Sequence, residues 1–149
     1  MARRSGVLFR STPASLALDH KLRRLARGEG AIIARRAVAV RLKSLIAEGF
    51  AKTQGPRGEQ WAPRVPPTGP WPLLRKTGKM FASYAVKVFG PQITIANSAV
   101  SDQGRPYPLF HQKGTRKMVA RKTVPDRTFS AHWRAELGKV VKLALEHLK

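Results

Sequence analysis

The stretch VKVFGPQITI, residues 86–95, decides the fold class of this chain. Apolar and polar residues alternate on both sides of Gly90 and Pro91, and this pair is a strong turn signal. The alternating apolar positions are Val86, Val88, Ile93 and Ile95. Such a pattern is typical of a β-hairpin that buries one of its faces. We therefore predict two antiparallel strands near the middle of the sequence.

Helical periodicity occurs on both sides of the hairpin. A helix is predicted from about Ala31 to Lys52, and another from about Ser130, its expected N-cap, to Leu148. The first is expected to bury one set of side chains and to leave another in solvent: Ile32, Ile33, Ala37, Val40, Ile46 and Phe50 inside, and Arg35, Arg36, Arg41 and Lys43 outside. The second is expected to bury Trp133, Leu137, Val140, Val141, Ala144 and Leu148.

The remaining segments have less regular patterns. A further helix is predicted from Pro13 to about Gly28, either separate from the next helix or continuous with it across a kink. Residues 1–12 are interpreted as a basic N-terminal arm, and residues 107–112 as a short apolar strand or turn. The predicted fold is therefore α+β, with a small antiparallel β-sheet flanked by N-terminal and C-terminal helices.

A long irregular segment separates the first helices from the hairpin. Residues 53–72 contain six prolines and two tryptophans, a composition that neither a helix nor a central strand tolerates. We therefore predict an extended Pro/Gly-rich loop that is pinned by Trp61 and Trp71. A loop of this length within a compact domain is usually functional.

The chain is strongly basic. It has 149 residues, the length of a single domain, and we treat residues 1–149 as one domain. Lys and Arg number 29 against 8 Asp and Glu, which gives a formal net charge of +21 that is spread over the whole sequence. A domain with this charge repels itself unless a polyanion neutralises it. Nucleic acid or an acidic protein surface is therefore the expected partner.

Several classes of protein are disfavoured by what the sequence lacks. It contains no cysteine, which excludes disulfides and thiolate chemistry and is compatible with a reducing cytoplasm. No segment approaches the roughly 20 apolar residues of a membrane span, so we expect no membrane partner. Arg10 and Pro13 interrupt the apolar stretch that a signal peptide would need, so none is expected.

No pattern of catalytic or ligand-binding residues is present in the sequence. The carboxylates are scattered, and the four histidines lack metal-ligand spacing: His20, His111, His132 and His147. Phosphate-binding loops and nucleophile elbows are absent from the sequence. We predict that the chain is not an enzyme and has no catalytic residues, no cofactor and no metal site.

Four short segments follow one another along the central half of the chain: GEQWAP at 58–63, LLRKTG at 73–78, YPLFHQKG at 107–114 and PDRTF at 125–129. With the hairpin between the second and third, this ordered set resembles the phage virion morphogenesis family, which includes Mu-like morphogenesis proteins and tail completion proteins. The family pattern reads G-x-x-W-x-P, L-L-x-x-T-G, Y-x-x-x-H-Q-x-G and P-x-R-x-F. The residues that carry it here are Trp61, Gly78, Tyr107, His111, Gly114, Pro125 and Arg127.

The chain departs from the family pattern in three respects. Its loop after Trp61 is unusually rich in proline, Asp126 stands where a small residue is commoner, and its charge is high.

Each signature residue also has a structural interpretation, which we favour. Gly78 and Gly114 are expected to supply turns with positive φ, and His111 a structural hydrogen bond. The aromatic residues expected in the core are Tyr107, Phe110 and Phe129.

The resemblance implies a structural protein at the head–tail junction of a tailed bacteriophage, such as a neck, tail completion or tail terminator component. It implies a homo-oligomeric ring, a hexamer or dodecamer, that binds connector, portal and tail tube proteins. Such a ring would assemble in the bacterial cytoplasm, reside in the virion, and surround double-stranded DNA without reading its sequence. The basic residues expected to face DNA or an acidic portal surface are Arg116, Lys117, Arg121 and Lys122.

The charge alone favours an alternative, a small basic protein that binds nucleic acid without sequence specificity. Its basic side chains would neutralise phosphates in a salt-dependent manner. The sequence contains no helix-turn-helix, zinc-site or aromatic signature of a sequence-specific binder. The tryptophans are expected to pack in the core or pin a loop rather than to stack on bases.

Overall fold

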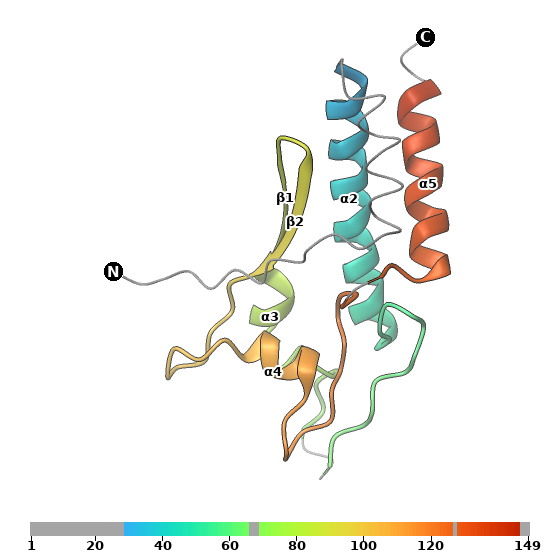
Figure 1. Ribbon diagram of the computed structural model, residues 1–149. Coiled ribbons are helices and arrows are strands. Elements are labelled where there is room, and N and C mark those ends of the chain that lie inside the picture. The colour runs from blue at the N-terminus through green and yellow to red at the C-terminus, as the bar shows by residue number, and fades with distance from the viewer. Residues whose placement is uncertain (1–28, 66–68, 127, 147–149) are drawn as a thin grey trace.

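The computed structural model describes residues 29–65, 69–126 and 128–146 (Figure 1). The elements follow in the order α2 (Glu29–Lys52), α3 (Lys79–Ala82), β1 (Tyr84–Phe89), β2 (Gln92–Asn97), α4 (Tyr107–Lys113) and α5 (Ala131–Glu146). Helices combined with an antiparallel hairpin make this an α+β fold, as predicted. The predictions that lie outside the described residues concern the arm at 1–12, the helix at 13–28, His20, Arg127, His147 and Leu148.

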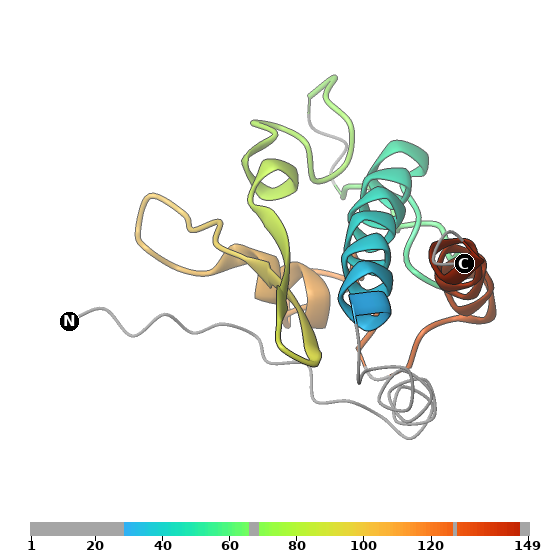
Figure 2. The ribbon, with the colours of Figure 1, turned by 90° about the horizontal axis from the view of Figure 1, so that it is seen from above.

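Helix α2 lies at the centre of the arrangement. The hairpin lies along one side of α2 and α5 lies along the other, running antiparallel to it (Figures 1 and 2). The buried side chains of α2 recur at intervals of three and four residues: Ala31, Ala34, Arg35, Val38, Ala39, Leu42, Leu45, Ile46 and Phe50. This spacing places them on one broad face of a helix with 3.6 residues per turn.

The buried face of α2 differs from the predicted one. Ile32, Ile33 and Val40 were expected inside but are exposed, whereas Arg35 was expected in solvent but is buried. The predicted set included Ala37, which is only partly buried, and left out Leu42 and Leu45, which are buried. The true face instead combines large residues with Ala31 and Ala34, whose small side chains occupy the buried positions at one end of the helix.

The hairpin has the predicted turn, and its register places the predicted apolar residues opposite one another. Val86 pairs with Ile95 and Val88 with Ile93 across the antiparallel ladder, so the four predicted apolar residues share one face. Gly90 has a φ of 52°, in the left-handed region that a two-residue hairpin turn requires. The face with Ile95 packs into the core, while Phe89 beside the turn is exposed.

Helix α5 begins with the predicted cap. The Ser130 Oγ accepts a hydrogen bond from the Trp133 N–H at 3.2 Å, which satisfies one of the donors left open in the first turn. Trp133 and Leu137 are buried, as expected. Arg41 of α2 then joins the two helices, because its guanidinium donates to Glu136 of α5 and to Glu48 of its own helix, each at 2.6 Å.

The apolar core joins α2, the loop, the hairpin and α5. Its centre is Phe50, which is fully buried and makes edge-to-face contacts with three rings: Trp61 at 5.3 Å, Phe81 at 5.2 Å and Tyr84 at 6.0 Å between centroids. Such pairs add to the stabilisation that burial provides. Met80, Val124, Trp133 and Leu137 complete the surroundings of this centre.

Residues 107–113 form helix α4, so the expected strand or turn was wrong. Pro108 lies in the first turn of α4, where its missing N–H would have no partner in the helix anyway. The apolar residues of this short segment are compatible with a strand as well as a helix, and only the position of Pro108 favoured a helix.

Among the described residues, no helix is both long and apolar enough to cross a membrane.

Alanine substitutions on α2 should distinguish its two faces. Leu45 is 2% exposed, so Leu45→Ala should lower the free energy of unfolding by about 2–5 kcal/mol through lost burial and a cavity. Val40 is 69% exposed, so Val40→Ala should change it by less than about 0.5 kcal/mol. Urea denaturation followed by circular dichroism measures both values. Similar losses in the two variants would contradict the assigned faces.

Candidate functional site

Segments that are far apart in the sequence meet beside the core, in a region that we call the signature junction (residues 61–63, 111–114 and 121–126). The Trp61 indole N–H donates to the carbonyl of Lys122 at 2.9 Å. Arg121 donates from Nε to the Ala62 carbonyl and from Nη2 to the Pro63 carbonyl, each at 2.8 Å. The Pro-rich loop is therefore fastened to the segment that precedes α5.

Gln112 provides the second set of contacts in the junction. Its side-chain oxygen accepts a hydrogen bond from the Thr123 N–H at 3.0 Å. Its side-chain nitrogen donates to the Val124 carbonyl and to Asp126 Oδ1. One amide group thus satisfies several polar groups of an irregular segment, which would otherwise lack partners away from water.

A hydroxyl pair ties the junction to the hairpin. The hydroxyl of Tyr84 in β1 is hydrogen-bonded to Thr123 Oγ1. Burial raises the pKa of the Tyr84 phenol, against the opposing effect of its hydrogen bonds to Thr123 and Asn97, so the phenol stays protonated near neutral pH. This contact is structural, because Tyr84 packs against the same core as Phe50.

His111 is tied to the junction through its main chain, and its buried ring nitrogen Nδ1 does not make the structural hydrogen bond that we expected. Its carbonyl accepts a hydrogen bond from the Arg121 N–H at 2.7 Å, and its ring meets Tyr107 edge-on with 6.3 Å between centroids. The His111 Nδ1 is buried and has no hydrogen-bond partner. Burial, followed by the charge of Arg121, lowers the pKa of His111 below its usual 6.5, so the ring is neutral at neutral pH.

The two signature glycines have positive φ, as predicted. Gly78 has a φ of 68° and precedes α3, while Gly114 has a φ of 76° and ends α4. At Gly114 a Cβ would lie 3.0 Å from both the Met118 oxygen and the Ala120 nitrogen. Conformation and space therefore both favour glycine at this position.

The four basic residues that we expected to face a polyanion divide into different environments. Arg121 is only 8% exposed and donates to loop carbonyls, so its prediction as a DNA-facing or portal-facing residue was wrong. Lys122 is exposed and forms an ion pair with Asp126. Arg116 and Lys117 are fully on the surface, at a turn between Thr115 and Met118.

The two tryptophans of the Pro-rich loop also lie in different environments. Trp61 is buried in the core, which agrees with its predicted role as a pin and prevents it from stacking on a base. Trp71 is partly exposed and lies near two cations, with Lys76 Nζ at 5.0 Å and the Arg64 guanidinium at 5.7 Å from its ring centroid. Arg64 also donates to the Trp71 and Pro72 carbonyls at 2.8 Å, and so holds the loop on this side.

The sequence interpretation missed the residues that hold the junction together. Gln112 stood in the family pattern without an assigned role, Arg121 was given an outward role, and Arg64, which fastens the loop beside the junction, was not singled out. Gln112 belonged to the quoted segment YPLFHQKG, which was its one available signal. Phe110 was expected in the core, but it is 38% exposed on the outer side of α4. Tyr107 and Phe129 do pack against the core.

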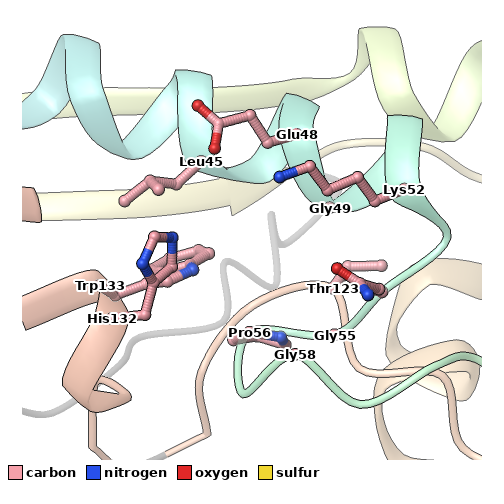
Figure 3. A pocket seen from close by; sticks show the side chains of 11 residues that line it. Leu45, Glu48, Gly49, Lys52, Gly55, Pro56, Gly58, Thr123, His132 and Trp133 are labelled. Atoms are coloured by element: carbon pink, nitrogen blue, oxygen red, sulfur yellow. The ribbon is translucent and has the colours of Figure 1, made fainter.

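Two hollows adjoin the junction. The first, of about 60 Å³, lies between the last turns of α2, the loop at Gly55 and Pro56, and the first turn of α5 with His132 (Figure 3). It is too small for an organic substrate. The second, of about 250 Å³, is lined by cations and carboxylates in equal number: Arg57, Lys122, Glu59 and Asp126. Among the described residues, no group of three or more potential ligands could hold a metal ion.

The signature junction therefore holds the Pro-rich loop, the end of α4 and the segment before α5 together through hydrogen bonds and packing.

Comparison with known protein families, curated proteins and solved structures finds no match for this chain. The resemblance to phage morphogenesis proteins consequently rests on the sequence segments alone.

Methionine substitutions of two arginines should test the corrected position of Arg121. Arg121→Met and Arg116→Met remove the same charge, but only the first leaves the Ala62 and Pro63 carbonyls without the donor that they have in the parent. We expect Arg121→Met to lower the free energy of unfolding by about 1–3 kcal/mol. Arg116→Met should leave it within about 0.5 kcal/mol of the parent value. Urea denaturation of both variants measures the difference, and equal stabilities would contradict the buried role of Arg121.

His111 should make the stability of the fold sensitive to acid. Its pKa in the folded state lies below 6.5, so the unfolded chain binds more protons as the pH falls below that value. The free energy of unfolding should therefore decrease between pH 7.5 and 5.5. The His111→Gln variant should show a weaker decrease, while a control at the exposed His132, His132→Gln, should keep it. Parallel pH profiles for the parent and His111→Gln would contradict this assignment.

Proposed function

We propose that this chain is a structural protein of a tailed-bacteriophage virion, located at the head–tail junction. In this proposal it forms an oligomeric ring that joins the tail to the head and surrounds the path of the DNA. The observation that supports it most is that the signature junction brings three of its four family-like segments together. Gln112 donates directly to Asp126, which joins the third segment to the fourth. Arg121, which lies between those two segments, donates to Ala62 of the first segment and to the His111 carbonyl of the third. The segments thus act as one structural unit, as the residues of a fold family do.

The character of the junction favours assembly over catalysis as its role. The side chains of Trp61, Gln112 and Arg121 are hydrogen-bonded to main-chain groups, and the histidine of the junction is neutral and half-buried. The two hollows beside it lie below the size of a typical ligand pocket. The residues of the junction are suited to holding a long loop in one conformation, which an assembly protein needs in order to present it to a neighbour.

The hairpin provides a surface for a neighbouring subunit. Its sheet has only the strands β1 and β2, so each strand has an outer edge without a strand partner in the described part of the chain. Open edges of this kind pair readily with other chains. Repetition of one such contact around an axis closes a ring when the rotation per subunit allows it.

The net charge supports an alternative function as a non-sequence-specific nucleic-acid-binding protein. A charge of +21 is well suited to phosphate contacts. However, Trp61 and Trp133 are buried, so neither offers a platform for stacked bases. A binder of this kind would depend on phosphate contacts and would lose affinity steeply as salt increases.

Light scattering after size-exclusion chromatography should distinguish the two functions. The full chain is treated with nuclease and analysed at low and high salt, alone and with purified tail tubes or portal complexes. The virion proposal predicts a nuclease-resistant ring, or a monomer that joins those complexes and remains bound at moderate salt. A monomer or dimer that binds a DNA duplex in a salt-sensitive manner, with no affinity for phage complexes, would favour the alternative.

A further inference from the structure

A tight turn projects from the chain directly after α4, and we call residues 113–119 the basic turn. The Thr115 N–H donates to the Met118 carbonyl at 2.8 Å and the Met118 N–H to the Thr115 carbonyl at 3.2 Å, so Arg116 and Lys117 occupy the tip. The Gly114 N–H donates to the Phe110 carbonyl at 2.7 Å, which joins the base of the turn to α4. Because its base is fastened, the turn presents its side chains from a defined position.

The cations of the basic turn have no carboxylate to pair with. The sequence contains no Asp or Glu between Asp102 and Asp126. Among the described residues, no ion pair includes Lys113, Arg116 or Lys117, and all three are exposed. This contrasts with Arg121 and Lys122 immediately after the turn, which are engaged within the chain.

Apolar side chains accompany these cations on the surface. Val119, in the basic turn, is 63% exposed, and Phe110, whose carbonyl holds the base of the turn, is 38% exposed. Contacts with DNA phosphates position a protein through charge and hydrogen bonds, and they do not require apolar groups in solvent. Aromatic side chains and arginine are instead enriched in protein–protein interfaces, whose buried centre is more apolar than the rest of the surface.

We propose that the basic turn is a docking element for an acidic protein surface, with Val119 and Phe110 entering an apolar depression between its carboxylates. This inference rests on the proposed function and assigns the partner of the turn as a protein of the particle rather than its DNA. A second copy of this chain is a poor partner, because the chain has few carboxylates and most of those described are already paired: Glu48, Asp126, Glu136 and Glu146.

Site-specific photo-crosslinking tests the identity of the partner. The full chain is expressed in its infected or induced host with Val119→benzoylphenylalanine, and the crosslinked peptides are identified by mass spectrometry. A matched control uses Leu143→benzoylphenylalanine, because Leu143 is also an exposed apolar residue but lies on α5. We expect position 119 to crosslink to an Asp- and Glu-rich segment of another protein, and position 143 not to crosslink to that segment.

Charge removal provides the second part of the test. Adding Arg116→Ser and Lys117→Ser should reduce the crosslink yield by about tenfold, since two interface ion pairs are lost. High salt should reduce the yield in the same direction. Crosslinks from position 119 to nucleic acid alone, to a second copy of this chain, or to no partner would overturn the proposal, as would a yield that is unaffected by the two substitutions.

The same cells separate this inference from the proposed function. If the chain is found in purified particles but position 119 does not crosslink to an acidic segment, the docking proposal fails and the virion proposal stands. If position 119 crosslinks to an acidic protein while purified particles contain none of the chain, the virion proposal fails and the docking chemistry stands. Circular dichroism of each purified variant excludes misfolding as the cause.

Discussion

The burial of Arg121 is the constraint on which the irregular half of the structure depends. A guanidinium held away from water is costly unless its N–H groups have acceptors. The carbonyls of Ala62 and Pro63 supply them, and these carbonyls belong to a Pro-rich segment that has few regular hydrogen bonds of its own. These two hydrogen bonds therefore satisfy N–H donors of Arg121 and carbonyl acceptors of the loop at the same time. The Lys122 carbonyl, directly after Arg121, accepts a hydrogen bond from the Trp61 indole N–H, and Phe50 packs against the Trp61 ring in the core.

Charge is organised differently inside and outside this framework. The carboxylates near the helices are engaged within the chain, as when Glu136 accepts hydrogen bonds from Lys139 and Arg41, which lower its pKa to about 2. With 29 Lys and Arg against 8 Asp and Glu, the cations far outnumber the carboxylates, and the chain has a net charge of +21. This division agrees with the proposed role in a particle, because a stable interior can coexist with an exterior that is neutralised only on assembly.

The basic turn carries exposed apolar side chains as well as positive charge, whereas positive charge alone attracts polyanions of any kind. Positive charge spread over a surface attracts any polyanion, and it does not distinguish DNA from an acidic protein. Exposed apolar side chains beside Arg116 and Lys117 do distinguish them, because their transfer from water is favourable only against another apolar surface. Under the proposed docking, the basic turn would select a protein, whereas positive charge elsewhere on the surface would attract any polyanion.

The sequence by itself determined those features whose cause is local. The alternation around Gly90, the Ser130 cap and the positive φ of Gly114 each follow from a few neighbouring residues, and each was predicted correctly. The tertiary structure alone decided which face of α2 is buried, that Phe110 is exposed, and that Arg121 turns inward while Arg116 stays in solvent. Both arginines lie in the same basic stretch, and only the approach of carbonyls about sixty residues away distinguishes them. Local periodicity carries no information about that approach, because a side chain becomes buried only when distant segments meet around it.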